Sequence, residues 1–356
     1  MKIAIITEYI EPQINGIATR YTEIIRNLRL QGHNVDVYAP ENHSDVNYIL
    51  PSISNFYNKH NKFMFPTIGL FNDILNRNYE VVYIVLPPLL WYPLLIIYLK
   101  LRNKNVKIVT SNHVDMMSYA NAYINNNFIK KIILPGIILH QFLIQNLLSD
   151  YIIAPSLFKD IEKYINKDKF HISRNGINHK KFPFKQKTNL TKNIIYVGRI
   201  APEKNLNKLF ELFLSLTNYT LTIIGDGPDL KSLKEIYKNN KNIKFEGFVE
   251  HLNLWKYFQN ADFHLVTSLS ETFGLTLIES MAVGTPVIYP NCDVFKDLYA
   301  NDFNELMFDL NNINSFNNSI NFLNENIENI SKKSYEFSKK FNWEYIVLDL
   351  INLFAR

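Results

Sequence analysis

Short uncharged runs rich in isoleucine, valine and tyrosine recur along the chain, and each ends in a polar or turn-forming loop. The first run, KIAIITEY, is followed by a loop with Asn15 and Gly16, by the helical pattern IATRYTEIIRNLRLQ and by a second run, NVDVYAP. A strand, a loop, a helix and a strand in this order form a βαβ unit, whose strands lie parallel in one sheet. This pattern constrains the fold more than any other feature, because it recurs in both halves of the chain.

The recurring runs form two series on either side of a polar, basic segment at residues 170–192. Three more runs precede the segment and five follow it: VVYIVL, VKIVTSN and DYIIAPS, then NIIYVGRI, YTLTIIGDGP, NIKFEGFV, DFHLVTS and TPVIYP. Turn residues and the lack of a long apolar period predict a linker over 170–192. The chain has 356 residues, the length of two ordinary domains. We therefore predict an α/β protein with two doubly wound, Rossmann-like domains over residues 1–175 and 190–340.

Two domains joined by one linker are expected to face each other across a deep cleft. Clefts of this kind, and the carboxyl ends of parallel strands, are where ligands usually bind. The C-terminal segment NWEYIVLDLINLFAR has the pattern of an amphipathic helix. We expect this helix, over about residues 341–356, to pack back on the first domain.

The composition is that of a folded protein from a reducing compartment. The chain is 47% hydrophobic and 20% charged, so it can bury large cores. Its one cysteine, Cys292, allows no intrachain disulfide, which fits a reducing compartment. The apolar run at the N-terminus is too short for a secretory signal and is typical of a buried strand. We therefore predict a cytoplasmic protein.

The formal net charge of +5 is unevenly distributed. Residues 1–186 hold 21 Lys and Arg against 13 Asp and Glu, whereas residues 187–356 hold 17 against 20. A basic first half indicates an anionic partner, such as an anionic membrane surface or nucleic acid, or else a solvated surface of uneven sign. A nucleic-acid surface needs a continuous basic stripe with interleaved aromatic residues. Here the basic residues cluster around the linker, so we predict no nucleic-acid partner.

Residues 81–99 form an uncharged segment about as long as a bilayer is thick. Three prolines interrupt the segment, which favours a strand, a Pro-Pro turn and a helix from about Leu89 over a membrane span. Such an apolar helix can also lie in a membrane interface. Residues 130–148 have the same character, and their alternative interpretation is a core helix.

The stretch ETFGLTLIE places Glu271 and Glu279 eight positions apart with no other charge between them. Gly274 is unfavourable inside a helix, so we expect the helix to begin within 273–275. Glu271 would then lie on the preceding loop, and Glu279 one turn or more along the helix. The free amides of residues 274–276, together with the helix dipole, favour an anion such as phosphate. A nucleotide sugar presents sugar hydroxyls, a pyrophosphate and ribose hydroxyls over a similar span; a capped surface helix is the alternative interpretation.

Further candidate residues follow other predicted strands. Arg199 and Lys204, after NIIYV, can neutralise a diphosphate, although two solvated cations are also common. The loop IIGDGP holds Gly225 and Gly227, which let backbone approach a ligand closely. His113, after VKIVTSN, can donate a hydrogen bond to a substrate oxygen or have a structural role.

These motifs, taken together, resemble the family-four retaining glycosyltransferases of the GT-B fold over nearly the whole chain. The residues that carry the resemblance are EPQINGIATR, SNHVDMMSYA, RNGINHKKF, YVGRIAPEKNL, IIGDGP, FEGFV and ETFGLTLIESMAVGTPVI. The last of these fits the family's signature of two glutamates with seven residues between them. Within the family, the chain is most similar to glycolipid and mannosyl-type enzymes such as sulfoquinovosyl-diacylglycerol synthases.

The resemblance implies a role for each matching position. Glu279 would hold the ribose hydroxyls, and Glu271 would contact the donor sugar. Arg199 and Lys204 would stabilise the departing diphosphate, and His113 would bind the sugar near its anomeric carbon. The remaining donor-binding positions would be Asn15, Gly16, Gly198, Gly225, Asp226, Gly227, Phe248, Val249, Phe273, Gly274, Leu275 and Thr276. Of these, Gly16 would approach the donor phosphate, and Phe248 and Val249 would lie by the base.

The resemblance also implies the reaction: a hexosyl group moves from a nucleotide-diphosphate sugar to a lipid or glycan hydroxyl by same-face substitution. The sequence has no Asp-x-Asp metal pair, and two cations can replace a metal electrostatically, so we predict no metal and no other cofactor. A basic first domain with apolar helices favours a lipid acceptor and peripheral contact with an anionic membrane. The alternatives are a nucleotide-sugar epimerase or a phosphorylase-type enzyme on the same scaffold, and a binding protein that kept the fold without catalysis.

The chain departs from the family's usual pattern at four positions. Asn178 stands where an aspartate is frequent and Arg174 where a proline is common, and Glu8 and Glu11 lie in a loop that more often holds Asp, Phe or Pro. These departures concern the acceptor and the fine geometry of the loops rather than the donor chemistry.

Overall fold

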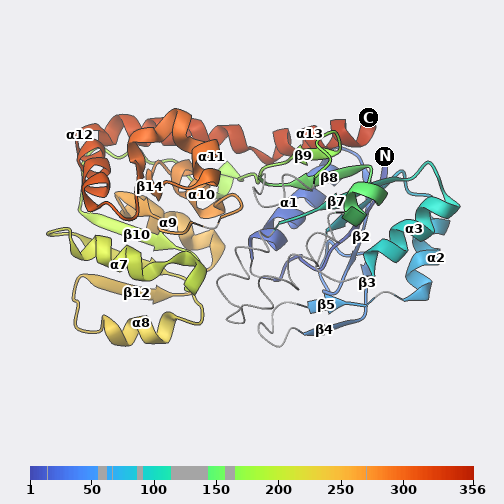
Figure 1. Cartoon of the computed structure of the whole chain (residues 1–356), viewed down its shortest axis with the longest axis horizontal. Helices are drawn as coiled ribbons and strands as arrows, with labels where there is room; N and C mark the ends of the chain where they lie inside the picture. The colour runs from blue at the N-terminus through green and yellow to red at the C-terminus, as the bar shows by residue number, and fades with distance from the viewer. Residues whose placement is uncertain are drawn as a thin grey trace. The chain divides into compact units, whose positions relative to one another are not determined.

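A computed structural model describes residues 1–13, 15–54, 62–65, 67–85, 91–113, 143–156, 165–269 and 271–356 (Figure 1). These residues form two compact units. The first unit comprises the described residues up to Gly176 together with Trp343–Arg356, and the second unit comprises Ile177–Asn342. Each unit is an α/β structure around its own parallel sheet, in agreement with the fold class predicted from the recurring strand pattern.

The first unit is built on a seven-stranded sheet in the order β3-β2-β1-β6-β7-β8-β9, in which all neighbouring strands are parallel. The strands are β1 (Lys2–Ile6), β2 (Asn34–Ala39), β3 (Tyr48–Ile49), β6 (Val81–Val85), β7 (Lys107–Ser111), β8 (Tyr151–Ala154) and β9 (Phe170–Ile172). Helices α1 (Gly16–Leu30), α2 (Ile68–Asn76) and α3 (Tyr92–Arg102) belong to this unit, as does an antiparallel hairpin of β4 (Ser52–Ser54) and β5 (Lys62–Met64).

Two sequence predictions in this unit are tested by the structure. The uncharged segment at 81–99 is not one long helix, because β6 ends at Val85 and α3 begins at Tyr92. Among the described residues, no helix is long and apolar enough to cross a membrane. The linker prediction over 170–192 was wrong at its start, because Phe170–Ile172 pairs with β8 as the edge strand of the sheet. Residues 114–142, which include most of the apolar run at 130–148, lie outside the described part of the chain, while residues 143–148 are helical.

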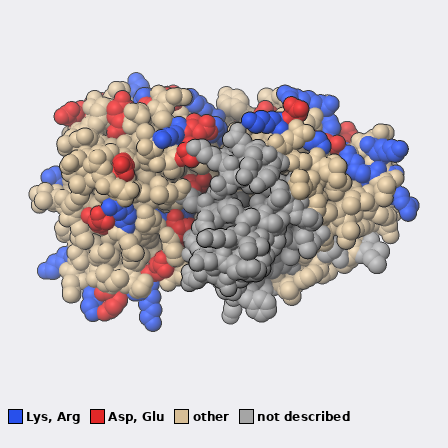
Figure 2. Space-filling view, in the orientation of Figure 1, with Lys and Arg blue, Asp and Glu red and all other residues tan. Residues whose placement is uncertain are grey.

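Charge is unevenly distributed over the surface of the first unit. Figure 2 shows Lys and Arg side chains along the upper right of this face, from the area where Figure 1 marks the chain ends towards the right-hand end, next to α3. Lys100 and Arg102 lie in the last turn of α3, where positive charge also complements the helix dipole. The basic first half of the sequence therefore has a counterpart on the surface near this helix.

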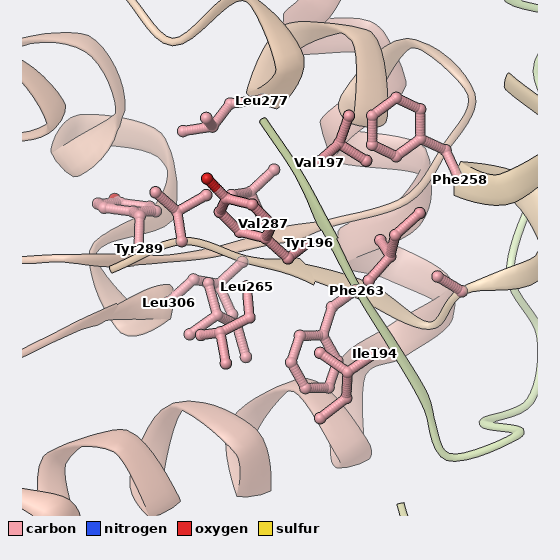
Figure 3. Packing of buried hydrophobic residues seen from close by; sticks show 14 of the residues in the cluster. Ile194, Tyr196, Val197, Phe258, Phe263, Leu265, Leu277, Val287, Tyr289 and Leu306 are labelled. Atoms are coloured by element: carbon pink, nitrogen blue, oxygen red, sulfur yellow. The ribbon is translucent and has the colours of Figure 1, made fainter. Parts of the chain in front are cut away.

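The second unit is built on a six-stranded parallel sheet in the order β12-β11-β10-β13-β14-β15. The strands are β10 (Asn193–Val197), β11 (Thr220–Ile224), β12 (Ile243–Gly247), β13 (Phe263–Leu265), β14 (Val287–Pro290) and β15 (Met307–Phe308). The helices are α7 (Leu206–Leu214), α8 (Leu230–Ile236), α9 (Leu254–Asn260), α10 (Leu275–Ala282), α11 (Asp293–Phe303) and α12 (Ile313–Ser338). Buried side chains of β10, β13 and β14 meet Phe258 of α9 and Leu277 of α10 in its core (Figure 3).

The strand order of the second unit creates one favourable place for a ligand. The chain runs outward from β10 through β11 to β12, then returns to the other side of β10 and continues through β13. In such a doubly wound sheet, ligands bind beyond the carboxyl ends of the strands where the order reverses. We call this side of the sheet the carboxyl edge; the loops after β10, β11, β12 and β13 all lie along it.

The C-terminal helix α13 (Trp343–Ala355) belongs to the core of the first unit. Its buried residues Val347 and Leu350 join the same hydrophobic cluster as residues of β1 and α1. At the start of the helix, the ring of Trp343 lies directly on Gly176, where an added Cβ would be 2.5 Å from the ring. The glycine of the RNG motif is thus required by the packing of this tryptophan.

Substitution of Leu350 by alanine tests the contribution of α13 to the first unit. Leu350 is buried and Leu348, two residues earlier on the same helix, is exposed. Leu350→Ala should reduce the free energy of unfolding of this unit by about 2–5 kcal/mol, because it leaves a cavity in the core. Leu348→Ala is the matched control and should have little effect. Equal losses for the two variants, measured by urea denaturation, would show that α13 does not complete this core.

Candidate functional site

The N-terminus of α10 opens onto the carboxyl edge of the second unit. The helix begins at Leu275, as predicted, and Gly274 precedes it with φ of 78° and ψ of 63°, a left-handed conformation that favours glycine. Phe273 is buried, and its ring packs against Phe341 with 5.4 Å between centroids. The buried ring anchors the loop, so the first amides of α10, which have no intrahelical acceptors, stand at the edge of the sheet.

Glu271, on the loop before α10, forms an ion pair with Lys204. The Nζ atom of Lys204 lies 2.5 Å from Oε1 of Glu271, and both side chains are largely buried. Two hydroxyl groups at the end of β13 hold the Lys204 turn in place. Thr267 donates to the carbonyl oxygens of Lys204 and Asn205, each at 3.1 Å, and Ser268 donates to the carbonyl oxygen of Glu203 at 3.1 Å.

Thr267 and Ser268 were not predicted from the sequence. The available signal was their position, because two hydroxyl residues directly follow the strand run DFHLV. Both hydroxyl groups contact a turn more than 60 residues earlier in the chain. Their position in the sequence does not indicate this partner.

Glu279 lies one turn into α10 and is almost completely buried, with 2% of its surface exposed. Its Oε1 atom is 2.6 Å from Nε2 of His251, a residue of the short helix η4 (His251–Asn253) that follows β12. The imidazole ring also packs edge-on against buried Phe182, with 5.5 Å between centroids. His251 is a further site residue that sequence reasoning missed, although it stands only two positions beyond Val249.

Arg199 and the glycine loops complete the edge on the β10–β11 side. Arg199 is half-exposed and lies 3.8 Å from Glu203. The loops after β10 and β11 are joined by backbone hydrogen bonds, from Gly198 to Ile224 at 3.0 Å and from Ile200 to Asp226 at 2.9 Å. The two strands are parallel neighbours in the sheet.

The glycines of this region have a structural role that the sequence did not predict. A Cβ on Gly225 would lie 1.9 Å from the carbonyl oxygen of Gly198, and a Cβ on Gly227 would lie 2.2 Å from that of Ile200. The close approach that these glycines permit is therefore between two loops of the protein. Asp226 accepts a hydrogen bond from the amide of Gly227 at 2.7 Å, which fixes the loop further.

Phe248 and Val249, which follow β12, differ in exposure. The ring of Phe248 is exposed, whereas Val249 is half-buried and packs against the core of the unit. The carboxyl edge of the second unit thus brings together, from different loops, nearly all the donor-binding residues predicted in this half of the chain. It combines two carboxylates, two cations, a helix N-terminus and an exposed aromatic ring.

In the first unit, His113 lies at the end of β7 in a cluster of hydroxyl groups. Its Nε2 atom is 2.7 Å from the hydroxyl of Tyr21 and 3.2 Å from that of Ser111, and Tyr21 also contacts Tyr83 at 3.0 Å. Burial, with a smaller contribution from Arg20, holds the pKa of His113 well below its ordinary value, so the ring is neutral. Nε2 of His113 is therefore engaged with hydroxyl groups of the protein.

Asn15 and Gly16 form the start of α1. The side chain of Asn15 accepts a hydrogen bond from the amide of Ala18 at 2.8 Å and so caps the helix, and Gly16 is the first helical residue. The Asn-Gly pair therefore has a clear structural role. Among the residues that the structure describes, no group of three histidine, cysteine, aspartate or glutamate side chains is arranged to hold a metal ion.

Two family models match consecutive parts of the chain. The model described as Glycosyltransferase Family 4 matches residues 14–181, and the model described as Glycosyl transferases group 1 matches residues 178–340. The chain belongs to the family-four glycosyltransferases. The resemblance stated from its motifs is therefore confirmed, and the two matched regions meet at the segment between β9 and β10.

Similar proteins include enzymes that glycosylate lipids. The glycosyltransferase is 27% identical over 320 residues to an alpha-monoglucosyldiacylglycerol synthase of Streptococcus pneumoniae, covering 81% of this chain and 70% of that protein. It is 39% identical over 124 residues to an enzyme of the same name from Acholeplasma laidlawii, covering 33% of this chain and 31% of that protein. It is 23% identical over 331 residues to a GDP-mannose-dependent alpha-mannosyltransferase of Mycobacterium tuberculosis, covering 84% and 81%.

Solved structures confirm the GT-B fold. Sucrose-phosphate synthase of Thermosynechococcus elongatus superposes with a TM-score of 0.73 at 18% identity, covering 99% of this chain and 98% of that one. HepE of Anabaena, in complex with UDP, superposes with a TM-score of 0.74 at 14% identity, covering the whole of both chains. At these identities the similarity concerns the fold alone.

Glu8, one of the residues where the glycosyltransferase departs from its family, is buried beside the β4–β5 hairpin. Its Oε1 atom accepts a hydrogen bond from the amide of Met64 at 2.7 Å. Gln13 donates to the backbone oxygen of Glu8 at 2.6 Å and to Oε1 of Glu41 at 3.1 Å. Burial raises the pKa of Glu8 to about 7. The departure thus has a structural role in joining the hairpin to the first loop.

The raised pKa of Glu8 makes a prediction about stability. Between pH 4.5 and about 7 the folded chain keeps the proton of Glu8 and the unfolded chain does not, so stability falls as the pH rises through this window. A glutamine at this position would be neutral at every pH and could still accept from the amide of Met64. Glu8→Gln should therefore become stabilising relative to wild type between pH 5 and pH 8, by up to about 3 kcal/mol.

Thermal unfolding of the two proteins across this pH range measures the effect. Glu246→Gln, at an exposed position on β12, is the control substitution and should change the melting temperature little. The interpretation of Glu8 fails if the difference in melting temperature between Glu8→Gln and wild type is the same at every pH.

Proposed function

We propose that this glycosyltransferase transfers a hexosyl group from a nucleotide-diphosphate sugar to the hydroxyl of a lipid or glycan, with retention of configuration. The observation that carries the proposal is the Lys204–Glu271 ion pair beside the N-terminus of α10. A carboxylate for sugar hydroxyls and a cation for a diphosphate stand here within one hydrogen bond of each other, next to free helix amides.

Each part of the carboxyl edge matches one part of such a donor. The amides at the start of α10 and the positive end of its dipole suit the diphosphate. Lys204 and Arg199 add positive charge where negative charge develops as the diphosphate departs. Buried Glu279 accepts from the ribose hydroxyls, and exposed Phe248 offers its ring to the base.

The proposed reaction is a same-face substitution. The bond between the anomeric carbon and the diphosphate oxygen breaks, and the bonding electrons leave with the diphosphate. The acceptor oxygen forms its bond to the anomeric carbon on the same face, and its proton passes to the departing diphosphate. Lys204 and Arg199 provide the electrostatic stabilisation that a metal ion provides in other enzymes, so we propose that the reaction needs no metal.

Transfer assays with substituted enzymes test the role of Lys204. Lys204→Met removes the cation and should lower kcat by about 10²–10³-fold, because stabilisation of the departing diphosphate is lost. Lys208→Met is a matched control. Lys208 pairs with Glu211 on α7 at the same distance of 2.5 Å, and the side chains of Lys204 and Lys208 are both 20% exposed. The control should retain full activity.

The assay uses UDP-, GDP- and ADP-sugars with diacylglycerol or oligosaccharide acceptors, and NMR of the product reports the anomeric configuration. Product formation with retained configuration, in the presence of EDTA, is the expected result. Donor conversion without any acceptor would instead indicate an epimerase, and conversion that requires inorganic phosphate would indicate a phosphorylase. Either outcome, or equal activity of Lys204→Met and Lys208→Met, contradicts the proposal.

We further propose a lipid acceptor, reached at the surface of an anionic membrane on the cytoplasmic side. Leu94, Ile97 and Leu101 lie on one face of α3 and are exposed, while the opposite face of the helix is buried in the core. Exposed Leu143 and Leu147 lie on the helical residues 143–148, which pack against the same core cluster. This apolar surface carries the lysine and arginine of the last turn of α3, a combination that suits an anionic lipid surface.

The relatives support the same choice of acceptor. Two of them are named alpha-monoglucosyldiacylglycerol synthases, so their acceptor is a lipid by name. The neighbouring structure of HepE holds UDP, which makes UDP-sugars the first donors to examine. The donor base and sugar follow from the transfer assay described above.

Sedimentation with lipid vesicles tests the α3 surface. The double variant Leu94→Glu, Leu101→Glu should bind vesicles of phosphatidylglycerol and phosphatidylcholine at least about tenfold more weakly than wild type, because two leucines that the lipid would bury are lost. Ile236→Glu, on α8 of the second unit, is the control, since Ile236 and Leu94 are both 64% exposed. Binding of wild type should also weaken in high salt. Equal binding by the double variant and wild type would exclude this surface as the membrane contact.

A further inference from the structure

The buried carboxylate of Glu279 has a partly exposed protein partner, the ring of His251. Glu279 is 2% exposed, whereas the side chain of His251 is 39% exposed, and the two meet at 2.6 Å between Oε1 and Nε2. With the Glu279 carboxylate as the acceptor, Nε2 of His251 donates the hydrogen of this contact. His251 is thus a partly exposed partner of a buried carboxylate at this edge.

The position of the His251 ring is determined by contacts on two sides. The ring packs against Phe182, which is buried, and is hydrogen-bonded to Glu279. The backbone turn that carries it is closed by a hydrogen bond from the amide of Asn253 to the carbonyl of Glu250 at 2.8 Å. A ring held in this way fixes the orientation of the carboxylate to which it is hydrogen-bonded. Supporting side chains orient the ligand-binding residues of other sites in the same manner.

The residues around His251 have the character of a nucleoside subsite. Phe248, three positions before it, and Leu252, directly after it, are both exposed apolar side chains at the same end of β12. A nucleoside needs an apolar surface for its base and acceptors for its ribose diol. Phe248 and Leu252, which flank His251 in the chain, provide the apolar surface, and the Glu279 carboxylate, which contacts the His251 ring, provides the acceptor.

We propose that His251 is a positioning residue for ribose recognition, an inference that rests on the proposed use of a nucleotide-diphosphate donor. Nε2 of His251 holds Oε1 of Glu279, which leaves Oε2 directed to the ribose hydroxyls. Because Oε1 is already occupied, Oε2 is held in one orientation. A ribonucleotide can donate its 2′-hydroxyl to this oxygen, whereas a 2′-deoxynucleotide has no hydroxyl at that position. His251 thereby determines selectivity for ribonucleotide donors.

Calorimetric titration with UDP, GDP and ADP and with the 2′-deoxy form of each nucleotide tests the inference. The measured quantity is the ratio of the Kd of the deoxy form to the Kd of the ribo form. For the nucleotide that binds best, we expect wild type to prefer the ribo form by about tenfold, the value of one hydrogen bond to a charged group. His251→Ala should bring the ratio close to one, and His251→Gln, which keeps a donor amide, should restore part of it.

The matched control is His179→Ala, which removes another partly buried histidine of the second unit. The side chain of His179 contacts Ser338 at 3.0 Å, and its ring packs against Tyr335. This variant should keep the wild-type ratio. A structural role of His251 alone would weaken the ribo and deoxy forms equally and leave the ratio unchanged, which would overturn the inference.

Glu279→Gln separates failure of the inference from failure of the proposed function. If Glu279→Gln loses the ribose preference and His251→Ala keeps it, the donor site stands and the role of His251 is wrong. If Glu279→Gln keeps the preference, or if wild type binds none of the six nucleotides, the donor site itself is wrong and the inference fails with it.

Discussion

The close packing of two backbone loops at the carboxyl edge of the second unit is the constraint on which the candidate site depends. Gly225 and Gly227 have no side chains, so the loop after β11 lies directly on the carbonyl groups of the loop after β10. That contact fixes the path of the chain from Gly198 to the turn that carries Lys204. From there the hydroxyl groups at the end of β13 join the turn to the loop before α10. A side chain at either glycine would separate these loops and displace the charged groups that they carry.

Ion pairing is the second physical feature of the site. Lys204 pairs with Glu271, and His251 contacts Glu279. Partly buried charges are costly without partners, so the pairs stabilise the site and hold the side chains near the positions that a donor would need. A bound diphosphate would replace Glu271 as the anionic partner of Lys204, so Lys204 would be paired both before and after binding. The site is thus largely organised before any ligand binds, which reduces the entropic cost of binding.

The sequence predicted the elements well and their long-range contacts poorly. Local patterns sufficed for the longer strands, β1, β2, β6, β7 and β8 of the first sheet and β10 to β14 of the second, and for the start of α10. The two-residue strands β3 and β15 were not predicted. The strand β9 was missed because its short run FHI lies in a polar segment and becomes a strand only by pairing with β8. The contact of His251 with Glu279 joins residues 28 positions apart, and its partner could not be deduced from spacing. The glycines of IIGDGP were recognised as sites of close approach, but the neighbour is another loop of the protein.

Hydrogen–deuterium exchange, measured with and without the nucleoside diphosphate that stabilises the protein most, tests the central claim most directly. The claim is that the carboxyl edge of the second unit binds the donor nucleotide. The account predicts slower exchange in the loops after β10, β11 and β12 and at the first amides of α10, where the diphosphate would accept hydrogen bonds. The strands β14 and β15, away from the point where the strand order reverses, should be unchanged. Binding without protection at the start of α10, or protection confined to other parts of the chain, would contradict it.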